Sequence, residues 1–239
     1  MKFEKTGDSC DISNKGKSCC STTIETNNEV NFKEHWDKAY LNSPENKLGW
    51  YETDLSPMLK LILKTGLSKS ARILNVGAGS TTLIDKLLDI GYSNIIATDI
   101  SEVALKKLEI RIGNKKAKYI IDDLTKPSKL KNIKPVDLWI DRAVLHFFTE
   151  ENEQNAYFDL LKSKIQNGGF VILAEYNLNG AKLCAGLPVY RYSKEMLTEK
   201  LGNDFELINS FDYTYKMPSG AERPYVYTLF KKINNEYVK

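Results

Sequence analysis

The sequence predicts an α/β protein built on a doubly wound, seven-stranded sheet that is mainly parallel and includes a terminal antiparallel strand. From Arg72 onward, apolar β-branched runs alternate with helical patterns, which is typical of a parallel sheet with helices on both faces. The first run leads through Gly77-Ala78-Gly79 directly into a helical pattern, which indicates a strand, a tight turn and a helix N-terminus. A polar or acidic residue follows each of five successive strands. In an open parallel sheet such strand ends share one rim, where ligands bind.

The composition is that of an ordinary globular chain. Of 239 residues, 42% are hydrophobic and 27% are charged, and the net charge of +3 is spread over many lysines without a dense basic block. We therefore expect no nucleic-acid partner. No apolar run approaches the length of a membrane span, and no apolar signal region stands near Met1, so we expect a cytoplasmic protein without a membrane partner. The composition leaves the oligomeric state open.

Four cysteines, Cys10, Cys19, Cys20 and Cys184, do not form a disulfide framework suited to a chain of this size, so reduced thiols are expected. Residues 1–28 are predicted to form a flexible polar tail that carries the first three. The favoured interpretation is free thiols, because C-x8-C-C does not match the common metal-ligand spacings. The alternative is a clamp for a soft ion or metalloid. No metal site is predicted.

Residues 29–66 are predicted to form two amphipathic helices before the first strand. The first begins near Asn31, and the second is expected to have Ser56 as its N-cap and Pro57 as its first helical residue. A turn between them leads to Trp50. The pair could be packing alone, or it could form a helical lid over a bound cofactor, which is the domain assignment we adopt.

Residues 67–239 are predicted to form the core as a single domain. Strands are expected at 72–76, 94–99, 117–121, 136–140, 170–174, 205–212 and 225–231. Helices are expected near 83–88, 101–113, 150–165 and 193–201. The last two strands, joined by a turn at 217–220, are expected to pair antiparallel.

The strand ends predict how a nucleotide-like cofactor is held. Asp99 lies 22 residues after Gly77, at the end of the second strand, where a carboxylate can accept both hydroxyls of a ribose. Asp122, after the third strand, is placed to receive an adenine amine, with Asp123 as the less favoured choice. A nicotinamide dinucleotide fits less well, because Thr82 stands where the third glycine of its fingerprint belongs.

This arrangement resembles the class I S-adenosylmethionine-dependent methyltransferases, which have a Rossmann-like fold, over roughly residues 31 to 231. The resemblance implies S-adenosylmethionine as cofactor and S-adenosylhomocysteine as product. It places the glycine turn under the methionine part, Asp99 at the ribose, Asp122 at the adenine and Asp141 beside the transferable methyl group. The cofactor-binding residues expected on this basis are Gly77, Ala78, Gly79, Asp99, Ile100, Asp122, Asp123, Leu124, Asp141 and Trp50.

The methyl acceptor is less well defined. The Asn/Asp-Pro-Pro-Tyr run of amide- and DNA-base methyltransferases is absent after the fourth strand, and Asp141-Arg142-Ala143-Val144-Leu145-His146-Phe147 stands there instead. His146 is a candidate general base beside Asp141, since an imidazole pKa near ~6.5 suits that role, or else it is a packed histidine. The loop after the fifth strand faces the acceptor in this architecture, and it contributes Cys184, Arg191 and Tyr192 as candidate substrate residues. Arg191 pairs either with an anionic acceptor or with a rim carboxylate.

The favoured function is methyl transfer to a small-molecule acceptor, such as a thiol or another soft nucleophile. Asp-Arg-Ala-Val-Leu-His-Phe and Gly-Leu-Pro-Val-x-Arg-Tyr resemble motifs of a group of small bacterial methyltransferases. Three alternatives remain open: an arsenite or metalloid methyltransferase that uses Cys184 and the tail cysteines, a protein lysine methyltransferase, and a non-catalytic S-adenosylmethionine-binding module.

Overall fold

The computed structural model describes residues 30–113 and 117–233. The chain divides into two units, residues 1–30 and 31–239, and the account below concerns the second. The predicted tail with Cys10, Cys19 and Cys20 lies outside the described residues.

Helices and strands alternate as the sequence predicts. The α-helices are α1 (Phe32–Asn42), α2 (Ser56–Lys64), α3 (Leu83–Asp89), α4 (Glu102–Ile112), α5 (Glu151–Lys164) and α6 (Lys194–Leu201), with 3-10 turns η1 (Glu45–Lys47), η2 (Leu130–Asn132) and η3 (Leu145–Phe147). The strands are β1 (Arg72–Val76), β2 (Asn94–Asp99), β3 (Ala117–Ile121), β4 (Val136–Arg142), β5 (Ile165–Tyr176), β6 (Leu183–Cys184), β7 (Leu187–Pro188), β8 (Phe205–Lys216) and β9 (Glu222–Lys232).

Seven of these strands form one sheet in the order β3-β2-β1-β4-β5-β9-β8. The first five run parallel, with Ile73 of β1 in register with Ile95 of β2 and Leu138 of β4. β9 is antiparallel to both β5 and β8, so the last strand of the chain is the antiparallel one and lies inside the sheet. The strand order reverses between β1 and β4, which is where an open α/β sheet forms its ligand-binding crevice. The predicted fold class is confirmed.

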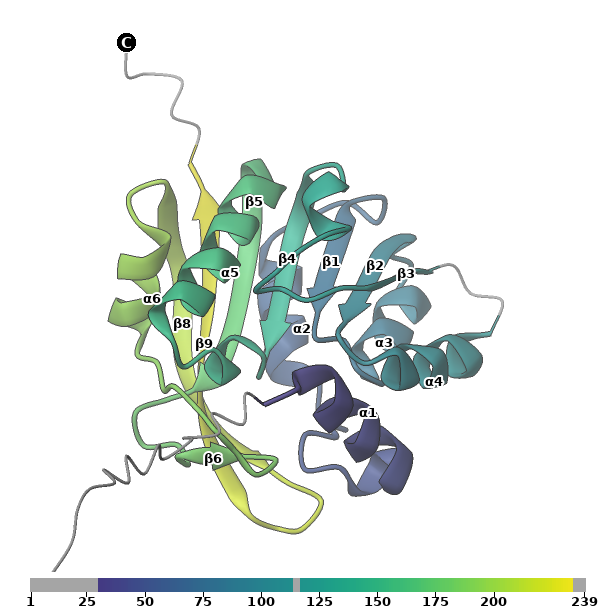
Figure 1. Cartoon of the computed structure of the whole chain (residues 1–239). Helices are drawn as coiled ribbons and strands as arrows, with labels where there is room; N and C mark the ends of the chain where they lie inside the picture. The colour runs from purple at the N-terminus through teal and green to yellow at the C-terminus, as the bar shows by residue number, and fades with distance from the viewer. Residues whose placement is uncertain (1–29, 114–116, 234–239) are drawn as a thin grey trace, which may run out of the picture. The chain divides into compact units, whose positions relative to one another are not determined.

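Successive side chains of the strands enter opposite layers of the core, because the side-chain period of a strand is two residues. Ile73 packs with α2, α3 and α4, whereas Leu74 packs with α5 and α6 on the other face. Figure 1 views the sheet from the side of α5 and α6. Burying one such side chain contributes about 1.5–3 kcal/mol, so the two apolar layers hold the strand ends in fixed positions.

The structure differs from the prediction mainly at element ends. β5 begins at Ile165 rather than at 170, so α5 passes directly into the strand. The hairpin of β8 and β9 is longer than expected because its pairing continues to Lys216 and Glu222. The expected N-cap at Ser56 is wrong: Ser56 is the first residue of α2, and its N–H donates to Asp54 Oδ1 at 3.0 Å.

Candidate cofactor and acceptor site

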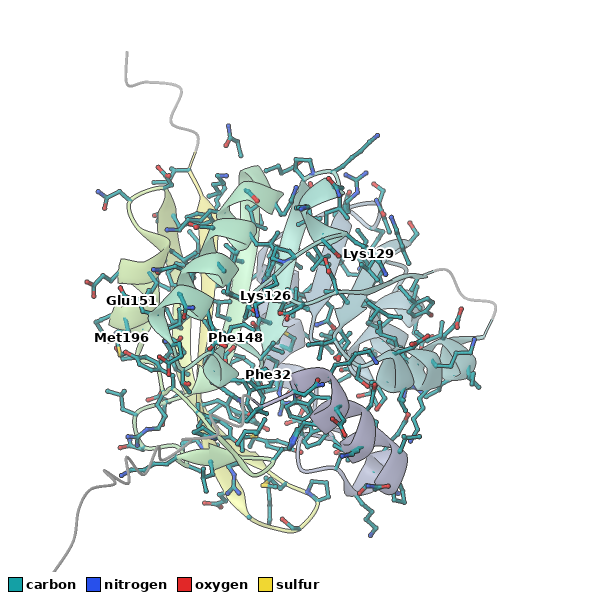
Figure 2. The ribbon with its side chains drawn as sticks, in the orientation of Figure 1. Phe32, Lys126, Lys129, Phe148, Glu151 and Met196 are labelled. Atoms are coloured by element: carbon teal, nitrogen blue, oxygen red, sulfur yellow. The ribbon has the colours of Figure 1, made fainter. Side chains whose placement is uncertain are left out.

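A cavity lies at the carboxyl ends of β1, β2, β3 and β4, with α1 forming part of its wall. Figure 1 shows α1 below the arrowheads of β1 and β4. Phe32 at the start of α1 and Phe148 after η3, both labelled in Figure 2, contribute aromatic wall. Among the predicted cofactor residues, those that line the cavity are Trp50, Gly77, Ala78, Asp99, Ile100, Asp122, Asp123 and Leu124.

The glycine turn and Asp99 form one hydrogen-bonded unit. Gly77 and Gly79 have φ angles of +53° and +51°, a conformation that glycine adopts without steric cost. The backbone N–H of Gly79 donates to Asp99 Oδ2 at 2.7 Å, and that of Ser101 donates to Asp99 Oδ1 at 2.8 Å. Burial raises the pKa of Asp99 to about 6, although these donors oppose the shift. A buried carboxylate at the end of β2 is thereby fixed against the turn.

α1 is fastened over this unit by polar contacts. Asp37 Oδ1 accepts from the Ser101 hydroxyl at 2.7 Å and from the Val103 backbone N–H at 3.3 Å. The hydroxyl of Tyr40, also on α1, accepts from Trp50 Nε1 at 2.9 Å. The segment predicted as a lid therefore contributes buried side chains to the cavity wall beside the glycine turn.

Replacing Gly79 by alanine is expected to weaken binding of S-adenosylhomocysteine by about 10-fold or more. A Cβ at Gly79 would lie 2.1 Å from the Tyr40 hydroxyl oxygen, so either α1 or the turn must move. Gly113→Ala is the matched control, because Gly113 also has a positive φ, +64°, but its Cβ would meet nothing within 4 Å. Calorimetric titration checks both variants, and equal affinities would contradict the assignment of this turn to the cofactor.

The two acids after β3 have different partners. Both oxygens of Asp122 accept hydrogen bonds from the 128–130 loop: from the N–H and hydroxyl of Ser128 and from the backbone N–H groups of Lys129 and Leu130, at 2.8–3.0 Å. Burial opposes ionisation, but these donors outweigh it and hold the pKa of Asp122 below its usual value. Asp123 uses only Oδ1, toward the N–H and hydroxyl of Thr125. Asp123 thus has the oxygen that makes fewer hydrogen bonds, and the expected role of Asp122 at the adenine amine stays a prediction.

Asp141 lies in the core and is absent from the cavity wall. Its carboxylate accepts from the N–H groups of Val144 and Leu145 at 3.1 and 3.2 Å and from the Tyr157 hydroxyl at 2.6 Å. Burial and the neighbouring charge of Glu175 raise the pKa of Asp141 well above its usual value, and burial raises the pKa of Glu175 to about 8. Two fully buried carboxyl groups this close favour sharing a proton. In the structure Asp141 holds the turn after β4, and its expected catalytic role stays a prediction.

His146 is also fully buried, and it reaches the site through Cys184. Its Nδ1 lies 3.0 Å from Glu175 Oε2, and its backbone N–H donates to the same oxygen at 3.2 Å. Cys184 lines the cavity, and the Tyr176 hydroxyl donates to its sulfur at 3.3 Å. Burial acts to raise the pKa of the Cys184 thiol, but the His146 ring, Tyr176 and the charge of Arg223 outweigh it, so this pKa lies below its usual value. Among the described residues, neither ring nitrogen of His146 has a hydrogen-bond partner, so the ring lies near Cys184 and Glu175 without a continuous hydrogen-bonded path between them.

Arg142 and Glu52 are cavity residues that the sequence reasoning missed. The Arg142 guanidinium lies against the rings of Tyr215 and Tyr225, with its central carbon 4.7 and 5.1 Å from the ring centroids. Its Nε lies 3.0 Å from Glu52 Oε2, and its Nη1 donates to the carbonyl of Trp50 at 3.3 Å. The position of Arg142 directly after a strand-end acid was the available signal. Glu52 lies 90 residues earlier, and no local pattern connects the two.

The other two predicted substrate residues are not among the lining residues of the cavity. Arg191 donates from Nη1 to the carbonyls of Leu178 and Gly180 at 2.7 and 3.4 Å. The Arg191 guanidinium holds the turn after β5, and its pairing with an anionic acceptor stays a prediction. Tyr192 is fully buried behind the cavity, and its backbone N–H donates to the carbonyl of Tyr176.

Comparison with known proteins agrees with this geometry. Residues 74–173 match the family model described as a methyltransferase domain. The chain is 23% identical over 207 residues to zebrafish (Danio rerio) EEF1A lysine methyltransferase 2, covering 80% of this chain and 82% of that protein. It is 28% identical over 92 residues to the mouse (Mus musculus) eEF1A lysine and N-terminal methyltransferase, covering 38% of this chain. That match spans only 13% of the mouse protein's length.

A solved structure shares the fold across most of the chain. The SAM-dependent methyltransferase from Anabaena variabilis superposes with a TM-score of 0.68 at 15% identity, covering 84% of this chain and 93% of that one. Together with the domain match, the shared fold supports S-adenosylmethionine as cofactor. In the described part of the chain, no helix is long and apolar enough to cross a membrane. Within the same residues, no group of three or more His, Cys, Asp or Glu side chains is placed to hold a metal ion.

Proposed function

We propose that this protein transfers the methyl group of S-adenosylmethionine to a small-molecule acceptor with a soft nucleophile, such as a thiol. The observation that supports this best is the cavity itself. One wall holds the cofactor-type residues, and Cys184, with its lowered thiol pKa, stands in the same cavity beside Arg142. A half-buried cavity partly walled by the aromatic side chains of α1 suits a small acceptor better than an extended polymer.

The residues present fit the cofactor. The glycine turn borders the cavity and tolerates no side chain, because a Cβ would lie 2.0 Å from Val144 Cγ2 at Gly77 and 2.1 Å from the Tyr40 hydroxyl oxygen at Gly79. Asp99 is proposed to hold the ribose, and the uncommitted Oδ2 of Asp123 to accept from the adenine amine. When bound, the cofactor supplies a methyl group on a sulfonium, which an acceptor lone pair displaces in line.

The chain's own contribution is proximity, orientation and removal of a proton. The aromatic wall formed by Trp36, Trp50 and Phe147, whose rings meet edge to face at 5.0–5.3 Å, keeps water from the reacting groups. Cys184 in its thiolate form is proposed to take the proton of a thiol or amine acceptor, and the buried His146 acts through it as a positioning residue. No metal is required by this scheme.

A protein lysine acceptor is the second candidate. The alignment over 82% of zebrafish EEF1A lysine methyltransferase 2 favours it. Against it stands the cavity with its aromatic wall, which suits a small acceptor better than an extended polymer. The metalloid alternative has less support, since Cys184 is the one cysteine among the described residues and soft metalloids favour several thiolates. A binding module without turnover is the remaining alternative.

Transfer of label from methyl-tritiated S-adenosylmethionine into a cell extract, sorted into volatile, small-molecule and protein fractions, tests these candidates together. We expect label in the volatile or small-molecule fraction. Label in protein alone would replace the proposal with the lysine candidate. No transfer, with binding of S-adenosylhomocysteine intact, would replace it with the binding module.

Cys184→Ser is expected to lower methyl transfer by about 100-fold or more, in the range of a positioned general base, and to leave affinity for S-adenosylhomocysteine within about 2-fold. The reason is that Cys184 is proposed to act on the acceptor and not to hold the cofactor. The lowered pKa belongs to its thiol, which serine lacks. Initial rates in the label assay and calorimetric titration measure the two quantities. Ser70→Ala, at an exposed loop before β1, is the control. Unchanged transfer in Cys184→Ser would remove Cys184 from the mechanism.

A further inference from the structure

The pair formed by Glu52 and Arg142 carries an unused acceptor and an unused donor, both facing the same cavity. Among the described residues, Glu52 Oε1 and Arg142 Nη2 are buried and have no hydrogen-bond partner. Their side chains are only 9% and 13% exposed, and both residues line the cavity. Leaving such atoms buried and unpaired is unfavourable, and more so for charged groups. Their arrangement therefore points to a ligand that pairs with both.

The surrounding contacts fix both groups in place. Arg142 Nε contacts Glu52 Oε2 and the hydroxyl of Tyr227, its Nη1 donates to the carbonyl of Trp50, and the guanidinium lies against the rings of Tyr215 and Tyr225. The carbonyl of Glu52 accepts from the hydroxyl of Thr82 at 2.9 Å, which ties Glu52 to the start of α3 beside the glycine turn. These contacts hold the free Nη2 and Oε1 in place beside the cavity.

The charges of the pair identify the complementary ligand. A guanidinium donor recognises a carboxylate, and a carboxylate acceptor recognises an ammonium group. Burial raises the pKa of Glu52, although the charge of Arg142 opposes the shift, so a further cation at Oε1 would favour the ionised form. A molecule that presents a carboxylate and an ammonium on adjacent atoms satisfies both groups at once.

We propose that Glu52 and Arg142 form a site for the zwitterionic head group of an α-amino acid, with the carboxylate on Arg142 Nη2 and the ammonium on Glu52 Oε1. Two molecules could supply this head group: the methionine part of the cofactor, or an amino-acid acceptor that carries a thiol. The inference rests on the proposed function, since it assigns part of the same cavity.

Calorimetric binding to wild type, Arg142→Met and Glu52→Gln tests the cofactor as the source. S-adenosylhomocysteine carries the head group, whereas 5′-methylthioadenosine has the same nucleoside without it. For this source we expect Arg142→Met to weaken S-adenosylhomocysteine binding by about 30- to 100-fold and Glu52→Gln by about 10-fold, with methylthioadenosine affinity changed less than about 2-fold. Retained methylthioadenosine binding also shows that the variant cavity is folded. Arg72→Met is the matched control, because Arg72 lies at the opposite end of β1 and binds the carbonyl of Pro135.

Binding to protein saturated with S-adenosylhomocysteine tests the acceptor as the source. L-cysteine carries both charges, cysteamine lacks the carboxylate and 3-mercaptopropionate lacks the ammonium. For this source we expect wild type to bind L-cysteine more tightly than either of the other two thiols. In both variants that preference should be lost, while S-adenosylhomocysteine affinity stays the same. If Arg142→Met fails to fold, Arg142→Lys and the isosteric Glu52→Gln carry the test.

The two proposals fail in distinguishable ways. Wild type that binds neither nucleoside ligand overturns the proposed function and this inference with it. If wild type binds S-adenosylhomocysteine, and both variants bind the nucleoside ligands and all three thiols with the wild-type affinities, only the head-group site is overturned. Selective loss in either experiment supports the site and identifies its ligand.

Discussion

Asp99→Ala is expected to weaken binding of S-adenosylhomocysteine by about 100-fold, which corresponds to loss of two charge-assisted hydrogen bonds. The carboxylate accepts from the N–H groups of Gly79 and Ser101 in the structure, and it is also the proposed ligand of the ribose hydroxyls. Alanine therefore removes a cofactor contact and the acceptor that fixes the glycine turn. No nearby side chain in this hydrogen-bonded unit replaces it.

Calorimetry on the purified full chain measures this effect, and thermal unfolding separates it from loss of the fold. Asp159→Ala, an exposed position on α5, is the control for removal of a carboxylate. Asp99→Asn should recover part of the affinity, since its amide oxygen can still accept one of the two N–H groups. If the alanine variant binds as tightly as wild type, the cofactor does not lie against the end of β2.

Glu175→Gln is expected to reduce the pH dependence of stability between about pH 5 and pH 8. Burial raises the pKa of Glu175 from 4.5 to about 8, so over this window the folded state binds a proton that the unfolded state has released. The free energy of unfolding therefore falls as pH rises, by about 1.4 kcal/mol for each unit of pKa difference. The stabilising effect of the proton is fully present below about pH 4.5 and is lost by about pH 8.

Glutamine at position 175 cannot ionise. The free energy of unfolding of the variant should therefore fall less between pH 5 and pH 8 than that of wild type, by an amount on the order of 2–5 kcal/mol. Denaturant unfolding at pH 5, 6, 7 and 8 measures it in wild type and variant. Glu206→Gln, at an exposed position on β8, is the control and should keep the wild-type slope. Parallel curves for Glu175→Gln and wild type would show that Glu175 is ionised throughout and that Asp141 carries the shared proton.

Local features of the fold could be predicted from the sequence because each depends on residues adjacent in the chain. The glycine turn is one case, since a positive φ and a strand–helix junction are both encoded within a few residues. Asp99 is another, because it directly follows a recognisable strand. The predicted ends of helices and strands were less accurate. For example, β8 continues past Asp212 because its length depends on pairing with β9.

The alternation of strands and helices, the rim of strand ends and the cofactor class were therefore determined by the sequence alone. Only the tertiary structure decided which rim acids are free. Asp122 and Asp123 are the same residue type, but residues 128–130 donate hydrogen bonds to both oxygens of Asp122. Asp123 accepts through Oδ1 alone. The pairing of Glu52 with Arg142 was likewise decided in three dimensions. Which hydrogen bonds a side chain makes, and how deeply it is buried, depend on contacts between segments distant in the sequence. Neither can therefore be assigned before the chain is folded.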